Sequence, residues 1–201
     1  MVPKTFSDSE RAYIKDRLIA EAKECLVLYG IRKTTVDELV KRVNIPKGTF
    51  YLFYESKELL FFDAFCTLHD EFQNKLMAEI AEFKTGVNGD TLTDIIFRLY
   101  KSLDGSCLLK LVTSGELELL FRKLPPELNK IHAEKDDFRV EELVSMVPDM
   151  KAENIRVFSA AIRGIFVTLL HKTEVGEDVF DEALFVMIRG VVFQMFEGEK
   201  H

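Results

Sequence analysis

The sequence has no uninterrupted apolar run long enough to cross a membrane. Its two most apolar stretches, residues 155–170 and 183–196, are interrupted by Arg156, Arg163 and Arg189, whereas a spanning helix needs roughly 18 apolar residues in a row. The first residues also lack the apolar segment of a secretory signal. These absences argue against a membrane protein and predict a cytoplasmic location.

Cysteine and histidine are scarce, with three and four copies. Cys25, Cys66 and Cys107 are odd in number, lie about forty residues apart and show no C-x-x-C spacing, which argues against a disulfide framework and a zinc site. The histidines have no neighbours at metal-binding spacing. We therefore expect no metal and no cofactor. The cysteines are interpreted as reduced thiols, with a redox-sensing role for Cys107 as the less favoured alternative.

The sequence also lacks the short motifs of the common enzyme classes. It contains no phosphate-binding glycine loop and no nucleophile elbow. An enzyme is therefore the less favoured class. Because 47% of the residues are hydrophobic and 30% are charged, the chain has enough apolar surface to fold into a globular protein.

Glycine and proline are sparse, at ten and five residues. Between them, apolar residues recur at three- and four-residue spacing, which predicts amphipathic helices, and no stretch alternates as a strand would. The sequence therefore predicts an all-α protein of about nine helices. These span about residues 7–30, 36–43, 46–54, 57–83, 91–103, 107–122, 126–147, 150–172 and 178–197.

Helix-capping patterns mark the first boundaries. Ser7 with Glu10, and Thr35 with Glu38, have the spacing of a capping box, in which a hydroxyl and a carboxylate satisfy backbone amides at a helix start. Pro46 suits a first helical position. The two short helices, joined by Asn44-Ile45 and preceded by a long capped helix, match the helix-turn-helix plan, in which the second short helix enters the DNA major groove. An ordinary three-helix corner is the alternative.

Charge is unevenly distributed along the chain. The net charge is −7. Residues 1–57 carry 11 Lys and Arg against 8 Asp and Glu, a balance of +3, while residues 58–201 carry 16 against 26, a balance of −10. Only the first part is suited to face phosphates.

Three short segments carry a family resemblance. They are KTTVDEL at residues 33–39, PKGTFY at residues 46–51 and SKELL at residues 56–60. Residues 10–65 resemble the DNA-binding domain of the tetracycline-repressor (TetR) family, whose Thr-Thr, Gly-Thr-x-Tyr and Ser-Lys-Glu elements appear here in order. The resemblance implies a homodimeric, ligand-responsive transcription regulator, most often a repressor, with operator DNA and a small molecule as its partners.

The resemblance also implies which residues bind DNA. Tyr51 and Lys57 correspond to residues of the family that hold the DNA backbone, and their phenol and ammonium groups suit phosphate. Lys47 and Thr49 are the candidates for base readout. Gly48, without a Cβ, allows the recognition helix to pack closely or to approach DNA. The full predicted set is Lys33, Thr34, Thr35, Pro46, Lys47, Gly48, Thr49, Tyr51, Leu52 and Lys57.

The chain departs from the family pattern at several positions. Leu52 and Phe53 stand where polar or basic residues and His are common, and Asn44 stands at the usual Gly of the turn. Because fewer donors then face the groove, we expect readout to depend on methyl contacts and DNA shape. Arg32, Lys33, Lys41 and Arg42 are either further phosphate contacts or merely solvated charges.

We expect the rest of the chain to sense a ligand and to dimerise. The predicted division is a DNA-binding domain at residues 1–56 and a second domain at residues 57–201, linked by the helix at 57–83. Fourteen of the seventeen phenylalanines lie after residue 60, which favours an apolar cavity. In an alternative reading the second domain only dimerises or binds a protein. The candidate ligand residues are Phe72, Phe97, Tyr100, Phe121 and Phe166. The candidate dimer residues are Ala160, Gly164, Gly190 and Phe193.

Overall fold

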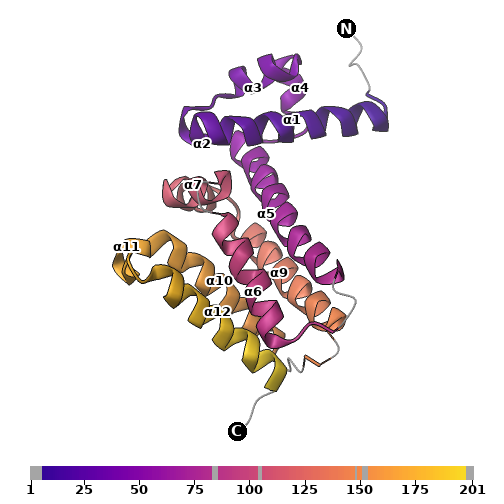
Figure 1. Cartoon of the computed structure of the whole chain (residues 1–201). Helices are drawn as coiled ribbons and strands as arrows, with labels where there is room; N and C mark the ends of the chain where they lie inside the picture. Colours follow the sequence, from indigo (N-terminus) through magenta and orange to yellow (C-terminus); the bar gives the residue numbers. More distant parts are fainter. Residues whose placement is uncertain (1–5, 83–85, 104–105, 148, 151–153, 198–201) are drawn as a thin grey trace. The chain divides into compact units, whose positions relative to one another are not determined.

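The protein is all-α, as predicted (Figure 1). The computed structural model describes residues 6–82, 86–103, 106–147, 149–150 and 154–197. Within these ranges the chain forms twelve α-helices, one short 3-10 helix and no strand. Nine of the α-helices have at least seven residues, in agreement with the predicted number.

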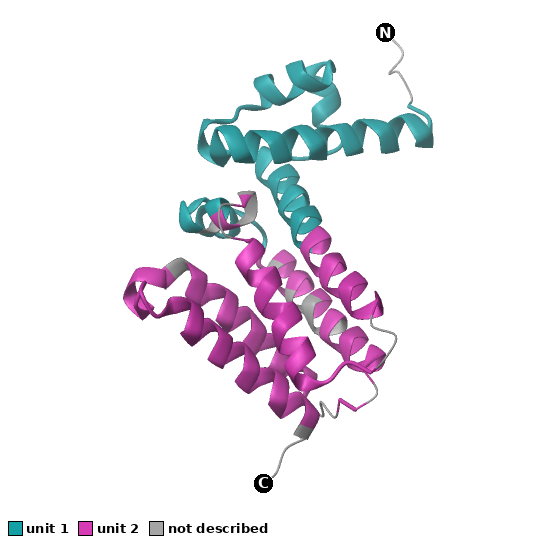
Figure 2. Ribbon diagram, in the orientation of Figure 1, with its two compact units in different colours: residues 1–69, 110–125 teal, residues 70–109, 126–201 magenta. Residues whose placement is uncertain are grey.

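The chain divides into two compact units (Figure 2). Unit 1 comprises residues 1–69 and 110–125, and unit 2 comprises residues 70–109 and 126–201. The predicted division into domains at residues 1–56 and 57–201 stays a prediction. Unit 1 contains α1 (Asp8–Leu28), α2 (Gly30–Lys33), α3 (Val36–Val43), α4 (Lys47–Phe50), the first part of α5 (Lys57–Glu82) and α8 (Glu116–Lys123).

Helix α1 has the predicted cap and one buried apolar stripe. The Ser7 amide donates to the Glu10 carboxylate at 2.9 Å, and the Glu10 amide donates to the Ser7 hydroxyl at 3.3 Å. These two bonds satisfy amides that lack a partner inside the helix. The stripe along α1 is buried in unit 1. Its members are Ile14, Leu18, Ala22, Cys25 and Leu26.

The predicted boundaries of α3 are also confirmed. The Thr35 hydroxyl accepts from the Glu38 amide at 3.2 Å and caps the start of α3. Asn44 ends the helix with φ +59°, a left-handed conformation that Asn adopts more readily than most residues. Pro46 is the N-cap of α4 rather than its first residue. At the start of α5, the Ser56 hydroxyl accepts from the Leu59 amide at 3.3 Å.

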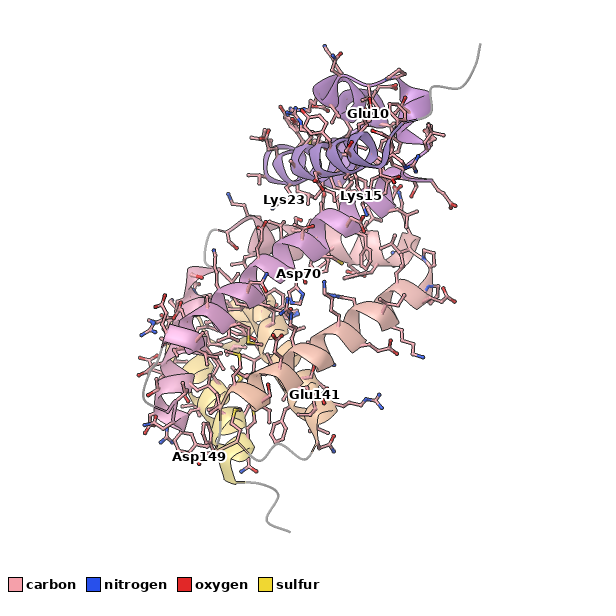
Figure 3. All side chains as sticks on the ribbon, turned by 90° about the vertical axis from the view of Figure 1, so that its right-hand side faces the viewer. Glu10, Lys15, Lys23, Asp70, Glu141 and Asp149 are labelled. Carbon is pink, nitrogen blue, oxygen red and sulfur yellow. The ribbon has the colours of Figure 1, made fainter. Side chains whose placement is uncertain are left out.

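Unit 2 is a bundle in which α12 packs against α6 and α10, and α10 against α9. An ion pair at 2.5 Å joins Lys135 of α9 to Asp70, which Figure 3 labels on α5. Fully buried Leu92, Leu184 and Ile188 belong to its core. Its elements are the second part of α5, α6 (Gly89–Ser102), the start of α7 (Cys107–Thr113), α9 (Pro126–Met146), α10 (Ile155–Thr168), η1 (Leu169–His171), α11 (Lys172–Val175) and α12 (Phe180–Glu197).

Three of the predicted helices differ from those observed. The helix expected at 107–122 is broken into α7 and α8, because Gly115 adopts φ +70°, which a helix does not tolerate. The helix expected at 150–172 begins only at Ile155, and residues 151–153 lie outside the described part. The helix expected at 46–54 gives way to turns after Phe50.

Two further expectations concern membranes and metals. None of the described helices is both long enough and apolar enough to span a membrane. In the same part of the chain, no group of three or more His, Cys, Asp or Glu side chains is arranged to hold a metal ion. The Cys107 side chain, the candidate redox sensor, lies outside the described residues. Burial raises the pKa of the Cys25 thiol and makes it a poor nucleophile.

Candidate nucleic-acid interface

The two short helices of the predicted motif depend on α1 for their position. Helix α1 packs against α3, and α3 packs against α4. Leu39 and Phe50 are fully buried, and Val40 is nearly so. Isolated helices of four and eight residues are unstable in water, so this apolar contact holds α3 and α4. The arrangement is that of a helix-turn-helix, drawn beside α1 in Figure 1.

Seven of the ten predicted DNA-binding residues are exposed. They lie at the end of α2, at the start of α3 and along α4 and the turn after it. The Tyr51 and Leu52 side chains are 50% and 58% exposed, although both carry large apolar surfaces. The structure therefore presents most of the predicted set to solvent. The seven residues are Lys33, Thr35, Pro46, Lys47, Gly48, Tyr51 and Leu52.

Gly48 is exposed on α4, and its lack of a side chain has no explanation inside the described protein. A Cβ built at this position would meet no atom within 4 Å, so close packing on a neighbouring helix, one of the two predicted roles, is wrong. Glycine inside a helix costs about 1 kcal/mol relative to alanine. Close approach by DNA stays a prediction, with a merely tolerated helical glycine as the alternative.

The structure corrects the assignment of Thr34 and Thr49. Thr34 is fully buried, and its hydroxyl donates to the Gly30 carbonyl at 2.8 Å. Thr49 is 8% exposed and faces the unit 1 core. Side chains buried in this way cannot reach a phosphate or a base edge. Both threonines stabilise the motif instead.

Lys57 is engaged inside unit 1. Its ammonium donates to the Ile31 carbonyl at 2.8 Å and to the Thr34 carbonyl at 2.7 Å, and thereby satisfies peptide groups at the end of α2. An ammonium has three donors, so one remains for a phosphate. Contact between Lys57 and DNA stays a prediction, but the side chain has a structural role that the sequence did not reveal.

Lys47 is paired with an acid on the neighbouring helix. Its ammonium lies 2.9 Å from one carboxylate oxygen of Asp37 and 3.0 Å from the other. The hydrogen bond to Asp37 raises the pKa of Lys47, so this residue stays cationic. Both side chains are more than half exposed, and such pairs contribute little to stability. A phosphate or a base can therefore displace Asp37 at small cost.

Arg42 was considered as a phosphate contact or a solvated charge, but the structure gives it another role. Its guanidinium lies 3.5 Å from Glu21 of α1 and 3.4 Å from Glu38 of α3, and 5.6 Å from the ring centre of Tyr29. Arg42 therefore joins α3 to α1 in an ion-pair network. Sequence reasoning missed this network because its members come from separate elements.

The candidate ligand residues are not all brought together. In unit 2, the Tyr100 ring contacts Phe72 and Phe166 edge to face, with centroids 6.2 and 6.4 Å apart. Phe97 pairs instead with Phe185. Phe121 lies in unit 1 and packs on Phe62 and Phe65. The prediction of one shared site is therefore wrong for Phe121, and Phe97 lies outside the Phe72–Tyr100–Phe166 group.

The fold of unit 1 and the exposed face of α3 and α4 are those of a helix-turn-helix domain. Residues 18–64 match the family model described as bacterial regulatory proteins, tetR family. The match covers the helix-turn-helix segment of the chain.

Two proteins of known description are similar to parts or all of the chain. Over 61 residues the chain is 36% identical to an uncharacterised HTH-type transcriptional regulator, YhgD, of Bacillus subtilis (strain 168), a match that covers 30% of this chain and 32% of that protein. A TetR-family regulator structure from Mesorhizobium loti is 14% identical and has a TM-score of 0.62, with 96% and 98% of the two chains covered. Both proteins are described as transcriptional regulators.

A third similar protein was solved with a ligand. The regulator FadR from Bacillus subtilis, in complex with stearoyl-CoA, is 21% identical and has a TM-score of 0.53, with 92% and 99% of the chains covered. At this identity the likeness shows a shared fold.

Replacing Lys57 by Met should destabilise the protein, because the Ile31 and Thr34 carbonyls lose their charged donor. Hydrogen bonds to charged groups contribute about 1.5–3 kcal/mol, and we expect the free energy of unfolding to fall by about that amount in urea denaturation. Lys41→Met, on exposed α3 surface, is the control and should change it by less than about 0.5 kcal/mol. Equal effects of the two substitutions would contradict the capping role.

Proposed function

We propose that this chain is a cytoplasmic transcriptional repressor that binds a near-palindromic operator as a homodimer and is released by a small, largely apolar effector. The observation that carries the DNA-binding part is the exposed surface of α3 and α4. Gly48 is open to solvent there, and Lys47 and Tyr51 lie close to it in sequence with exposed side chains.

The proposed contacts divide into two kinds. Tyr51, Thr35 and Lys33 hold phosphates through a phenol, a hydroxyl and an ammonium. Leu52 and Gly48 face the groove, where apolar contact with thymine methyls and close backbone approach are possible. This division predicts that operator selectivity comes from shape and methyl contacts more than from hydrogen bonds.

The homodimer is supported by exposed apolar positions on α10. Val157 and Val167 are 55% and 49% exposed, and Ala160 and Gly164 are exposed between them. Their spacing of three, four and three residues forms one stripe along the helix. A Cβ at Gly164 would meet no atom within 4 Å, so nothing in the described chain requires glycine there.

Helix α12 has a matching stripe. Val186 is 67% exposed, and Gly190, one turn later, is exposed with open space around its Cα. The Phe193 ring packs against Gly89 within unit 2, about 3.1 Å from the position that a Cβ of Gly89 would take. Only part of this ring is therefore available to a second copy. Because α10 packs on α12, a second copy can cover both stripes and form a four-helix interface.

Dimerisation supplies the geometry for operator binding. Two recognition helices about 34–36 Å apart reach successive major grooves on one face of DNA. An effector that changes this spacing weakens the complex. A coupling of about 1–3 kcal/mol, or roughly 5–150-fold in affinity, is enough for a switch. We propose α5 as the transmitter, because it is one continuous helix from Lys57 to Glu82.

The effector is proposed to bind beside the group of Phe72, Tyr100 and Phe166. These rings come from α5, α6 and α10, and the Tyr100 hydroxyl already donates to the Ile162 carbonyl at 3.0 Å. An aromatic group whose polar atom is satisfied favours an apolar ligand. The stearoyl-CoA bound to the similar FadR protein provides a first ligand to test.

Gly48→Ala should separate DNA binding from folding. Alanine is the better helix former and meets no neighbour, so the thermal midpoint should stay or rise. Affinity for an operator selected from random DNA should fall about tenfold or more, because the methyl group blocks close approach. Gly86→Ala, where a Cβ also meets nothing, is the control. Unchanged operator affinity for Gly48→Ala would refute the proposed role of α4.

Val186→Lys should break the proposed dimer. A lysine at a 67% exposed position leaves the isolated chain folded, but it places like charges together across a two-fold interface. Sedimentation equilibrium should show a shift from dimer toward monomer, with operator binding reduced in parallel. Val175→Lys, at a 39% exposed valine on α11, should leave the dimer intact. A dimer unaffected by Val186→Lys would place the interface elsewhere.

Ligand binding can be followed through thermal stability and operator release. Stearoyl-CoA, free fatty acids and small aromatic compounds are added to the purified protein. We expect a binder to raise the thermal midpoint and to weaken operator binding. Phe166→Leu should reduce both effects, whereas Phe97→Leu, outside the proposed group, should not. Absence of any shift across the panel would favour the alternative, a second domain that dimerises or binds a protein.

A further inference from the structure

Helix α2 is a single turn and cannot satisfy its own peptide groups. Residues Gly30–Lys33 form the whole helix, whereas the first four amides and last four carbonyls of any α-helix lack partners within it. Side chains supply several of the missing partners. Thr34 donates to the Gly30 carbonyl, and Lys57 donates to the carbonyls of Ile31 and Thr34.

The other end of α2 is held by a residue far away in sequence. The Ile31 amide donates to the carboxylate of Glu116, the first residue of α8 and 85 positions along the chain. Both residues belong to unit 1. A carboxylate at a helix start and an ammonium at its end match the partial charges of the two ends. Helix α2 is therefore bound at both ends by side chains of the matching sign.

Gly30 is shaped for this contact. A Cβ at Gly30 would lie 2.5 to 2.7 Å from the carboxylate atoms of Glu116, so a larger residue there would push the carboxylate out of its present position. Gly30 also has φ +75°, which L side chains rarely adopt. Glycine at this position therefore both permits the backbone conformation and leaves the Glu116 carboxylate where it accepts from the Ile31 amide.

The position of α2 determines where α3 begins. Thr35, the N-cap of α3, follows directly after Thr34, whose carbonyl Lys57 binds. Helix α3 in turn packs against α4. A displacement of α2 therefore moves the exposed residues of both helices.

We propose that Glu116 is a positioning residue for DNA binding: its carboxylate, seated on the Gly30–Ile31 backbone opposite Lys57, fixes α2 and thereby the helix-turn-helix. This inference rests on the proposed function. It identifies an acidic side chain as necessary for operator binding. Simple electrostatics predicts the opposite sign, because removing a negative charge from a DNA-binding unit strengthens attraction to phosphate.

The test compares Glu116→Ala and Glu116→Gln with Glu118→Ala, an exposed acid on the same helix. We expect Glu116→Ala to weaken binding to an operator selected from random DNA by about 5- to 30-fold, within the usual range of coupling between sites. Binding to a random-sequence duplex, and the salt dependence of both complexes, should stay near wild type because no cation is lost. Glu118→Ala should leave binding to the operator and to the random-sequence duplex unchanged or slightly stronger. Glu116→Gln, which keeps an acceptor oxygen, should retain part of the operator affinity.

A double-mutant cycle isolates the contact. Gly30→Ala should weaken operator binding strongly in the wild-type background but less in the Glu116→Ala background, where the carboxylate that it would meet is gone. Additive effects of the two substitutions would overturn the proposal. So would operator affinity in Glu116→Ala equal to that in Glu118→Ala.

Hydrogen exchange tests the contact between the Ile31 amide and the Glu116 carboxylate without DNA. In the full-length protein, the Ile31 amide should exchange at least about tenfold faster in Glu116→Ala than in Glu118→Ala, because it loses its acceptor. Unchanged exchange of the Ile31 amide would show that the Glu116 carboxylate does not hold α2, even if operator binding is normal. If exchange accelerates as expected while the wild-type protein binds no DNA at low salt, the contact is real but the proposed DNA-binding function fails.

Discussion

Unit 1 depends on the burial of a few large side chains that hold very short helices. Helices α2 and α4 have four residues each and α3 has eight, so none would persist alone. Leu18, Leu39 and Phe50 are fully buried, and burying a side chain of this size contributes about 1.5–3 kcal/mol. This apolar contact allows the outward-facing residues of α3 and α4 to serve binding, since few of them are needed for packing.

Capping residues in the sequence predicted those helix boundaries that depend on contacts within one turn of the chain. Ser7 with Glu10, Thr35 with Glu38, and Asn44 act within one turn of the chain, and all were found at the expected places. Helix α2 was missed because four residues show no periodicity. The break at Gly115 was also missed. Gly115 takes a left-handed conformation between two apolar segments, and the three- and four-residue spacing alone fits a continuous helix as well as a broken one.

The DNA-binding residues show what a motif can and cannot predict. The motif placed the candidates within or next to the correct helices, but it did not say which way each side chain points. Thr34 and Thr49 point inward, while Leu52, a departure from the family pattern, points outward. The roles of Lys57 and Glu116 depend on partners up to 26 and 85 residues away. Such contacts follow from the tertiary fold, so no local pattern contains them.

The charge of residues 1–57 limits how the proposed DNA-binding surface can recognise DNA. A balance of only +3 over residues 1–57 gives weak attraction to phosphate in general. Lys47 is further offset by Asp37, whose carboxylate it leaves only when a better acceptor is offered. The cost of displacing Asp37 is the same for every DNA sequence, so a sequence that also fits Leu52 and Gly48 has the larger net gain. Weak general attraction with a close-fitting apolar face favours discrimination between sequences over tight binding to all of them.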